Sequence, residues 1–255
     1  MMKKVYEIVF SPTGGTQKVA DVLTRAWGGE TVGIDLTDRE ADFRSMALDG
    51  EDLAVIAVPS YGGRVPVPAA ERLSRIRGNG ARAVIVCVYG NRAYEDTLVE
   101  LQDTVQQAGF VVVAAVAAIA EHSIAHAYGA NRSDEEDCRQ LQAFARRIAE
   151  KLAGGDVTTP AIPGNRLYKK AGRAGLVPKA TGACNRCGRC AAECPVGAID
   201  RDNPARVDKQ ACISCMRCVS VCPHHARKVN GVLLALVNRM LKKACSVRKA
   251  CELYV

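Results

Sequence analysis

The sequence CNRCGRCAAECP at residues 184–195 and the sequence CISCMRCVSVCP at residues 212–223 carry one pattern of cysteine and proline. In both, the cysteines are spaced C-x2-C-x2-C-x3-C, and a proline follows the last one. Three thiolates in so short a loop can bind three corner irons of a cubane cluster, while the fourth iron needs a ligand from elsewhere. Because this spacing is the bacterial signature of 4Fe-4S centres, its repetition predicts two such centres.

Two other uses of clustered cysteines fit these residues less well. A zinc ribbon needs two C-x2-C pairs and would leave half of these cysteines without a function. A disulfide scaffold is typical of short secreted chains, and the N-terminus shows no signal-peptide pattern. The cysteines outside the two runs are expected to be ordinary free thiols, namely Cys87, Cys138, Cys245 and Cys251.

The segment around the two cysteine runs resembles a two-cluster bacterial ferredoxin. The similarity extends to Cys-Pro-Val-Gly-Ala-Ile at 194–199 and to Val207-Asp208 ahead of the second run. In such ferredoxins the fourth cysteine of each run binds the cluster of the other run. The resemblance therefore implies two interleaved ligand sets: Cys184, Cys187, Cys190 and Cys222 in the first, and Cys212, Cys215, Cys218 and Cys194 in the second.

Length and composition indicate one ordinary domain and a smaller one. The 255 residues include 48% hydrophobic residues, enough for a real core, and no apolar run is long enough to span a membrane. Twelve cysteines without an export signal favour a reducing compartment. We therefore expect a soluble, cytoplasmic protein.

Charge is divided unevenly along the chain. Residues 1–157 contain 17 Lys and Arg against 22 Asp and Glu, whereas residues 158–255 contain 18 against 5. The second part stays basic even if each oxidised cluster contributes about two negative charges. A basic surface can attract nucleic acid, an anionic membrane or an acidic protein. Because these charges surround predicted electron carriers, we expect an acidic redox protein or reductase, and no nucleic acid, membrane span or peripheral membrane attachment; oligomeric state stays open.

A second motif lies near the N-terminus, where Ser11-Pro12-Thr13-Gly14-Gly15-Thr16 separates a predicted strand at 5–10 from a predicted helix at 17–27. A phosphate at the start of this helix would meet backbone N–H groups and the hydroxyls of Ser11, Thr13 and Thr16. The loop has neither the G-x4-G-K-[ST] nor the G-x-G-x-x-G order, so direct oxidation of NAD(P)H is not indicated. A helix N-cap loop without a ligand is the structural alternative.

This loop matches the S-x-T-G-x-T loop with which flavodoxins hold the phosphate of FMN, so the first half of the chain resembles a flavodoxin. Further predicted strands alternate with helices, the strands at 31–36, 53–58, 83–88 and 110–119 and the helices at 67–77, 94–108 and 133–152. Five buried strands alternating with helices predict a doubly wound, parallel α/β sheet. The resemblance implies the strand order 2-1-3-4-5, with FMN at the carboxyl ends of the strands.

Two further loops should meet the phosphate loop at that end, one after the third strand and one after the fourth. The resemblance implies that all three contact the flavin through Ser11, Thr13, Gly14, Gly15, Thr16, Pro59, Ser60, Tyr61, Gly62, Gly63, Tyr89, Gly90, Asn91 and Arg92. Tyr61 and Tyr89 are candidates to cover the flavin ring, although tyrosines in turns often only pack. His122 follows the fifth strand on the same rim, but no acid or nucleophile stands at a recognisable spacing, so catalytic residues stay unknown.

These motifs divide the chain into four segments: a flavodoxin-like FMN domain at 1–155, a basic linker at 156–183, a small α+β two-cluster ferredoxin domain at 184–230, and an amphipathic helix and tail at 231–255. The linker is either a solvated connector or a docking strip for an acidic protein.

Taken whole, the chain resembles the fused flavodoxin and two-cluster ferredoxin proteins of anaerobic prokaryotes, the EFR-type ferredoxins. The resemblance implies electron transfer between FMN and two 4Fe-4S clusters, linking two-electron and one-electron carriers or relaying low-potential electrons to a partner enzyme. The alternative is an FMN and iron-sulfur oxidoreductase that reduces a small molecule with electrons from the clusters. A third hypothesis, a nucleic-acid-binding surface built on the clusters, has little aromatic support. We favour the carrier over the enzyme.

Overall fold

The computed structural model describes residues 4–172 and 175–255, so Arg173 of the predicted linker lies outside the described residues. The first part alternates strands and helices in the order β1 Val5–Val9, α1 Gly15–Arg25, β2 Thr31–Asp35, β3 Leu53–Pro59, α2 Val67–Leu73, β4 Arg82–Tyr89, α3 Thr97–Gln107, β5 Val111–Ile119 and α4 Glu135–Ala153. The second part contains short elements and one longer helix: β6 Lys179–Ala180, α5 Arg189–Ala192, α6 Arg217–Ser220, β7 Arg227–Lys228, α7 Gly231–Cys245 and β8 Glu252–Tyr254.

The main sheet has the order β2-β1-β3-β4-β5-β8, and its first five strands run parallel. This is the flavodoxin-like order 2-1-3-4-5, so the predicted fold class is confirmed. The sixth strand was not predicted. β8 pairs antiparallel with β5, with Ala115 opposite Tyr254 and Ala117 opposite Glu252, so part of the predicted tail completes the sheet edge.

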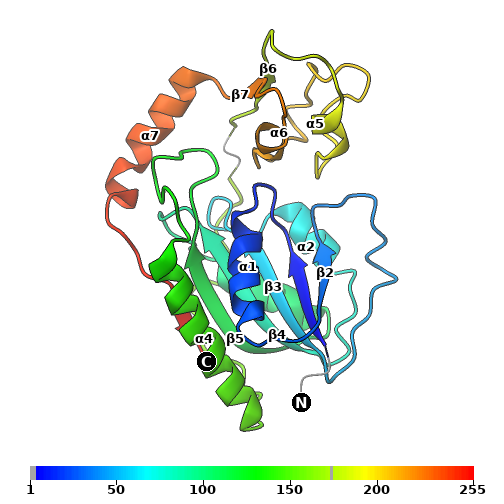
Figure 1. Ribbon diagram of the computed structural model, residues 1–255, viewed down its shortest axis with the longest axis vertical. Helices are drawn as coiled ribbons and strands as arrows, with labels where there is room; N and C mark the ends of the chain where they lie inside the picture. Colours follow the sequence, from blue (N-terminus) through cyan, green and yellow to red (C-terminus); the bar gives the residue numbers. More distant parts are fainter. Residues whose placement is uncertain (1–3, 173–174) are drawn as a thin grey trace.

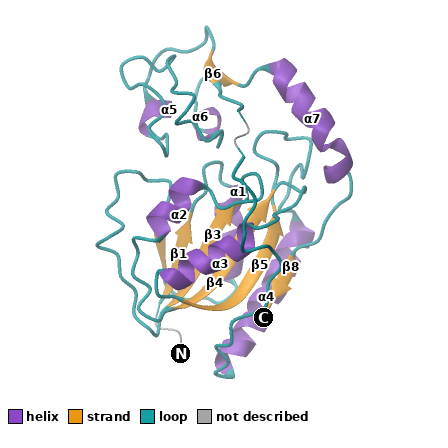
Figure 2. Cartoon of the chain, turned by 180° about the vertical axis from the view of Figure 1, so that it is seen from behind, coloured by secondary structure: helices purple, strands orange, loops and turns teal. Residues whose placement is uncertain are grey.

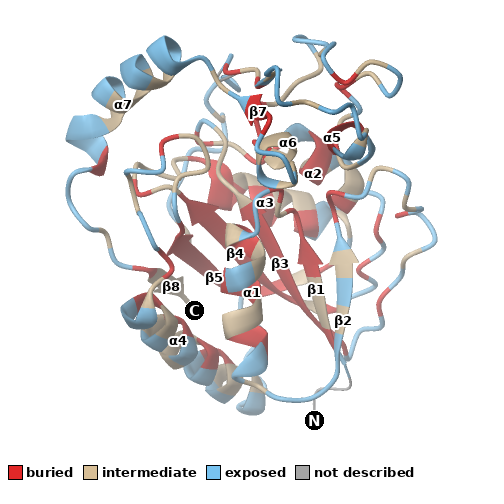
Figure 3. Cartoon of the chain, turned by 45° about the horizontal axis from the view of Figure 1, so that its top comes forward, coloured by how far each residue is buried: buried red, intermediate tan, exposed pale blue. Residues whose placement is uncertain are grey.

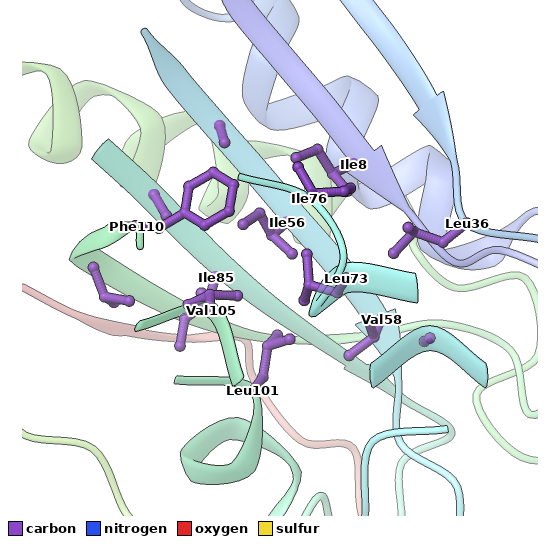
Figure 4. Close-up of a cluster of buried hydrophobic side chains, with 14 of the residues drawn as sticks. Ile8, Leu36, Ile56, Val58, Leu73, Ile76, Ile85, Leu101, Val105 and Phe110 are labelled. Atoms are coloured by element: carbon purple, nitrogen blue, oxygen red, sulfur yellow. The ribbon is translucent and has the colours of Figure 1, made fainter. Parts of the chain in front are cut away.

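Helices cover both faces of the sheet because its central strands are apolar on both sides. The helices α2 and α3 cover one face, and α1 and α4 cover the other (Figure 2). Ile8, Ile56, Ile85 and Leu101 are fully buried in the core under α2 and α3 (Figure 4). Burial of each such side chain contributes about 1.5–3 kcal/mol, so the sheet forms a rigid base for the loops at its carboxyl edge.

The bounds of the helices follow from local signals. Helix α1 begins at Gly15 because Gly14 takes a left-handed conformation with φ of 90°, which glycine adopts without strain. Helix α4 begins with a capping box, in which the Asp134 side chain accepts from the Asp137 N–H and the Asp137 side chain accepts from the Asp134 N–H. Both helices thereby keep fixed positions against the sheet.

The two cysteine runs fold alike. Each run forms a loop followed by a single helical turn, which is α5 in the first run and α6 in the second. The residue before each turn is left-handed: Gly188 has a φ of 75° and Met216 has a φ of 63°. The short β6–β7 ribbon lies beside these turns, and the whole part lies over the end of the sheet from which the loops emerge (Figure 1).

Helix α7 leaves this part and runs along the outside of the molecule, largely exposed (Figure 3). Its first turn is capped by Asn230, whose side chain accepts from the Val232 and Leu233 N–H groups. The chain then returns to the sheet as β8. In the described residues, no helix combines the length and the apolar character needed to cross a bilayer.

The described part of the predicted linker packs on α3. The carboxylate of Asp96 accepts from the backbone N–H groups of Asn165 (2.9 Å) and Lys169 (2.8 Å), and Arg166 pairs with Asp103 at 3.1 Å. Lys169 also pairs with Glu95. Two of the linker cations are therefore already bound to carboxylates of the first domain, which weakens the hypothesis of a free docking strip.

Candidate cofactor sites

The eight cysteines of the two runs line two separate cavities. The first is lined by Cys184, Cys187, Cys190 and Cys222, and the second by Cys194, Cys212, Cys215 and Cys218. Each cavity thus takes three cysteines from one run and the last cysteine of the other, as the ferredoxin resemblance implies. In residues 4–172 and 175–255, no three Cys, His, Asp or Glu side chains are arranged to hold a single metal ion; the thiols surround a cavity instead.

Hydrogen-bond donors point at sulfur atoms in both cavities. Arg227 Nη2 donates to Cys190 Sγ at 3.3 Å, and the Ala226 N–H donates to Cys222 Sγ at 3.3 Å. Burial raises the pKa of Cys212, and a hydrogen bond from the Ser214 N–H opposes that rise. Donors of this kind stabilise sulfur that carries negative charge, so the donor set fits an iron-sulfur cluster.

The second cavity is more deeply buried than the first. Burial raises the pKa of the Cys215 and Cys218 thiols to about 12, so a strong positive charge such as iron is needed to hold them as thiolates. Cys187 of the first run, which occupies the position of Cys215 in the second run, is exposed. The difference in burial follows the residues between the cysteines. In the first run these are Asn185, Arg186 and Gly188, which are exposed or half-buried, and in the second run they are Ile213, Ser214 and Met216, which are half-buried or buried.

A third cavity of about 550 Å³ lies between the carboxyl edge of the sheet and the cysteine-rich part. This volume is typical of small-molecule and cofactor sites. Most of the predicted flavin contacts line it, namely Thr13, Gly15, Thr16, Pro59, Ser60, Tyr61, Gly62, Tyr89, Gly90 and Arg92. The topology therefore brings the three predicted loops together.

The loop before α1 has the features of a phosphate site. Ser11 Oγ accepts from the Gln17 N–H at 2.9 Å, which holds the loop in place and leaves the Ser11 hydroxyl proton available to donate. A Cβ atom on Gly15 would lie only 3.1 Å from Ala120 Cβ, so a larger residue there would press the helix start away from the end of β5. The N–H groups of the first helical turn supply donors for a phosphate, and the loop residues therefore fit FMN.

Four predicted flavin contacts do not line this cavity. The Ser11 side chain accepts from the Gln17 N–H in the first turn of α1, and Gly14 lines a neighbouring cavity of about 420 Å³. Gly63 packs so closely on Glu95 that a Cβ atom there would meet its side chain. The Asn91 side chain instead donates to the Cys245 and Val247 carbonyls, both at 2.9 Å, and so holds the C-terminal segment.

The two candidate tyrosines differ in their surroundings. Tyr61 is half-buried in the cavity wall, and burial and the nearby Cys215 raise its pKa well above the ordinary value. Tyr89 is buried in the core, where its ring packs edge-on against Tyr94 with centroids 5.3 Å apart. Tyr61 is therefore the better placed of the two to cover a flavin ring.

His122 also lines the cavity, as the topology implied. Its Nδ1 accepts from the Ile124 N–H (3.2 Å) and the Ala125 N–H (3.1 Å), so the proton of the neutral ring sits on Nε2. Burial lowers the pKa of His122, which favours this neutral form at neutral pH.

Several cavity residues have no counterpart among the predicted contacts. They come from the linker, the second cysteine run and α7, namely Lys169, Lys170, Gly172, Leu176, Ile213, Ser214, Val237, Met240 and Leu241. The only sequence signal for them is the apolar side of α7 and the apolar and small residues inside the second run. Neither signal indicates that these residues line the cavity at the carboxyl edge of the sheet.

Direct contacts join the second cysteine run to the phosphate loop. Arg217 Nη1 donates to the Pro12 carbonyl at 3.2 Å, and Arg217 also pairs with Glu193 at 2.7 Å. Ile213 packs against the hydrophobic core under α2 and α3. From the other side, Arg39 Nη1 donates to the Cys194 carbonyl at 3.3 Å. The second cavity is thus held against the loop before α1.

Known proteins are similar to separate parts of the chain. Residues 177–251 match the 4Fe-4S dicluster domain family. Similar solved structures include a flavodoxin from Streptococcus pneumoniae, with 20% identity over 58% of this chain and 97% of that chain and a TM-score of 0.40. Flavodoxin 1 from Bacillus cereus has 16% identity over 58% and 98% of the two chains, with a TM-score of 0.42.

Rubredoxin oxygen:oxidoreductase from Desulfovibrio gigas has 17% identity over 59% of this chain and 36% of that chain, with a TM-score of 0.44. No curated protein sequence matches the chain. The chain therefore joins a flavodoxin-like fold, shown by its strand order, to a 4Fe-4S dicluster domain that contains both cysteine runs. This combination supports a role in electron transfer.

Proposed function

We propose that this protein transfers electrons between FMN and two 4Fe-4S clusters within one chain. One observation carries the proposal: Ile213 and Ser214, which lie between two cysteines of the second cavity, also line the cavity formed by the phosphate loop. Electron transfer slows steeply with distance, so two redox groups that share a wall are well placed to exchange electrons.

The flavodoxin-like loops would hold FMN. Thr13, Thr16 and the N–H groups at the start of α1 bind the phosphate, while Tyr61 and the backbone of Gly62 and Gly90 line the space for the ring. Bound FMN supplies a group that exchanges one or two electrons, whereas each cluster exchanges one.

The two cysteine sets would hold the clusters. Cys194, Cys212, Cys215 and Cys218 bind the cluster next to the flavin cavity, and Cys184, Cys187, Cys190 and Cys222 bind the outer one. The contacts of Arg217 and Ile213 with the flavodoxin-like part would fix the distance between the second cluster and the flavin. The protein also supplies N–H donors to the ligand sulfur atoms. An acidic redox protein or reductase is the proposed external partner, given the basic second half of the chain.

The test is an anaerobic redox titration of the purified protein, followed by visible absorption and EPR, with iron, sulfide and FMN counted per chain. The proposal requires about one FMN and about eight iron atoms per chain. It further requires that electrons delivered by brief photoreduction redistribute between flavin and clusters at a rate independent of protein concentration. Zinc in place of iron, or redistribution only between separate molecules, would contradict it.

One observation favours a second function, the FMN-dependent reduction of a small molecule. The apolar residues Val237, Met240 and Leu241 of α7 line the flavin cavity together with His122, so the cavity has both apolar side chains and an imidazole N–H donor in its wall. Turnover of a small acceptor without any partner protein, lost in His122→Ala but not in a control such as His126→Ala on the exposed part of that loop, would support this enzyme over the carrier.

A further inference from the structure

The two cysteine runs, though equal in spacing, present their cavities to different surroundings. Asn185, Arg186 and Cys187 of the first run are all exposed. At the last two of these positions the second run has Ser214 and Cys215, which are both buried, and Ser214 also lines the flavin cavity. A large partner cannot reach the second cavity through the flavin site, so the first cavity is the one whose ligands a protein can approach.

The rim of this first cavity carries positive charge without internal partners. Arg186 lies inside the first run, and Lys179 and Lys228 lie opposite each other in the β6–β7 ribbon, beside Ala226 and Arg227 of the cavity wall. All three side chains are exposed, and no carboxylate of the described residues pairs with them. Like charges placed directly opposite in a ribbon destabilise it, so stability does not account for this lysine pair.

The chemistry of the rim favours an acidic protein over other anionic surfaces. Residues 169–253 contain no Phe, Tyr or Trp. Single-stranded nucleic acid is usually held by stacking on such rings, and helices at a membrane surface usually carry them as anchors. Positive charge around an exposed redox site instead suits an acidic carrier, which it attracts and orients.

We propose that the rim formed by Arg186, Lys179 and Lys228 is the docking face for an acidic one-electron carrier protein, which exchanges one electron with the cluster held by the first cysteine set. The proposal rests on the proposed function. It adds an order: the second cluster faces the flavin, and the first cluster faces the partner.

The experiment compares two charge-reversed proteins. Arg186→Glu with Lys228→Glu changes the rim, and Lys242→Glu with Lys243→Glu makes the same change of net charge at exposed positions on α7. Each holoprotein is reduced anaerobically and mixed in a stopped-flow instrument with a small acidic [2Fe–2S] ferredoxin as oxidant. We expect the rim variant to lower the second-order rate constant about tenfold at low salt, the α7 control to stay within about twofold, and added salt to slow the wild type.

The outcomes separate the docking face from the relay. Equal rates in both variants would overturn the docking face but would leave intact the proposed electron transfer between FMN and the clusters. Salt-sensitive binding of the wild type to anionic phospholipid vesicles, lost in the rim variant while carrier rates stay unchanged, would assign the rim to a membrane and also overturn it. Iron and FMN content and the flavin–cluster redistribution, measured on the same samples, should match the wild type; their absence in the wild type would overturn the relay itself.

Discussion

Arg227 is predicted to raise the reduction potential of both clusters. Arg227 is 2% exposed, and its guanidinium lies close to cysteines of both sets. It donates to Cys190 Sγ in the first cavity and to the Pro178 carbonyl, each at 3.3 Å. In the second cavity, where burial raises the pKa of Cys212 and Cys218, its charge acts to lower the pKa of both thiols.

The magnitude follows from Coulomb's law. Reduction adds one negative charge to a cluster, and a guanidinium in contact with a ligand sulfur lies about 7 Å from the centre of that charge. At an effective dielectric constant of about 20, the attraction is about 2.4 kcal/mol. Since 59 mV corresponds to a tenfold change for a one-electron couple, Arg227→Gln should lower the potential of the first cluster by about 100 mV, and that of the second by less.

The assay is an EPR-monitored potentiometric titration of the clusters. Arg227→Lys keeps the charge and should recover most of the shift, whereas Lys228→Gln removes the exposed neighbouring charge and should change little. Iron content and thermal unfolding confirm that each variant is folded. A folded Arg227→Gln protein whose potentials move by less than about 20 mV, or move upward, would refute the reasoning.

Three further perturbations test other parts of the structure. The double variant Thr13→Ala with Thr16→Ala removes two hydroxyl donors. Because a hydrogen bond to a charged group contributes about 1.5 kcal/mol or more, this variant should weaken FMN binding at least tenfold without changing the cluster EPR signals. Unchanged FMN affinity would contradict the assignment of this loop. The Lys169 and Asn165 N–H groups lower the pKa of Asp96. The stability that this contact gives to the attached linker is therefore fully present above the unfolded carboxyl pKa of about 3.9 and is lost as pH falls through the lower pKa of the folded state. Asp96→Asn should speed limited proteolysis of the linker at pH 7, whereas the control Asp156→Asn should not. Asp137→Ala leaves the buried Arg132 unpaired and should cost about 3–5 kcal/mol of unfolding free energy in urea. Glu135→Ala, at an exposed position on the same helical turn, should cost under about 1 kcal/mol.

The parts of the fold that sequence reasoning predicted carry strong local signals. The nine apolar residues of β5 are typical of a strand buried on both faces, and the glycine-rich loop before α1 marks the start of a helix. The ferredoxin resemblance implied two interleaved sets of four cysteines, and the same two groups line the two small cavities of the structure. Local pattern and final structure agree at all these places.

The parts that were missed depend on contacts between distant segments. β8 has three residues, and only the open edge of β5 makes them a strand. Asn91 follows β4 as a flavin contact would, yet its side chain holds Cys245 and Val247, more than 150 residues later. In the same way, the apolar side of α7 was visible as a helical pattern, but nothing in that pattern indicates the 550 Å³ cavity that α7 lines.

The position of β8 changes how the cysteine-rich part relates to the sheet. That part is inserted between the fifth and sixth strands of one sheet, held on one side by the linker on α3 and on the other by the return of the chain to β5. During synthesis the sheet edge cannot close until both cysteine runs and α7 have left the ribosome. Folding of the cysteine-rich part and completion of the main sheet are therefore steps of a single folding process, and an insertion anchored at both ends has little freedom to swing away from the carboxyl edge of the sheet.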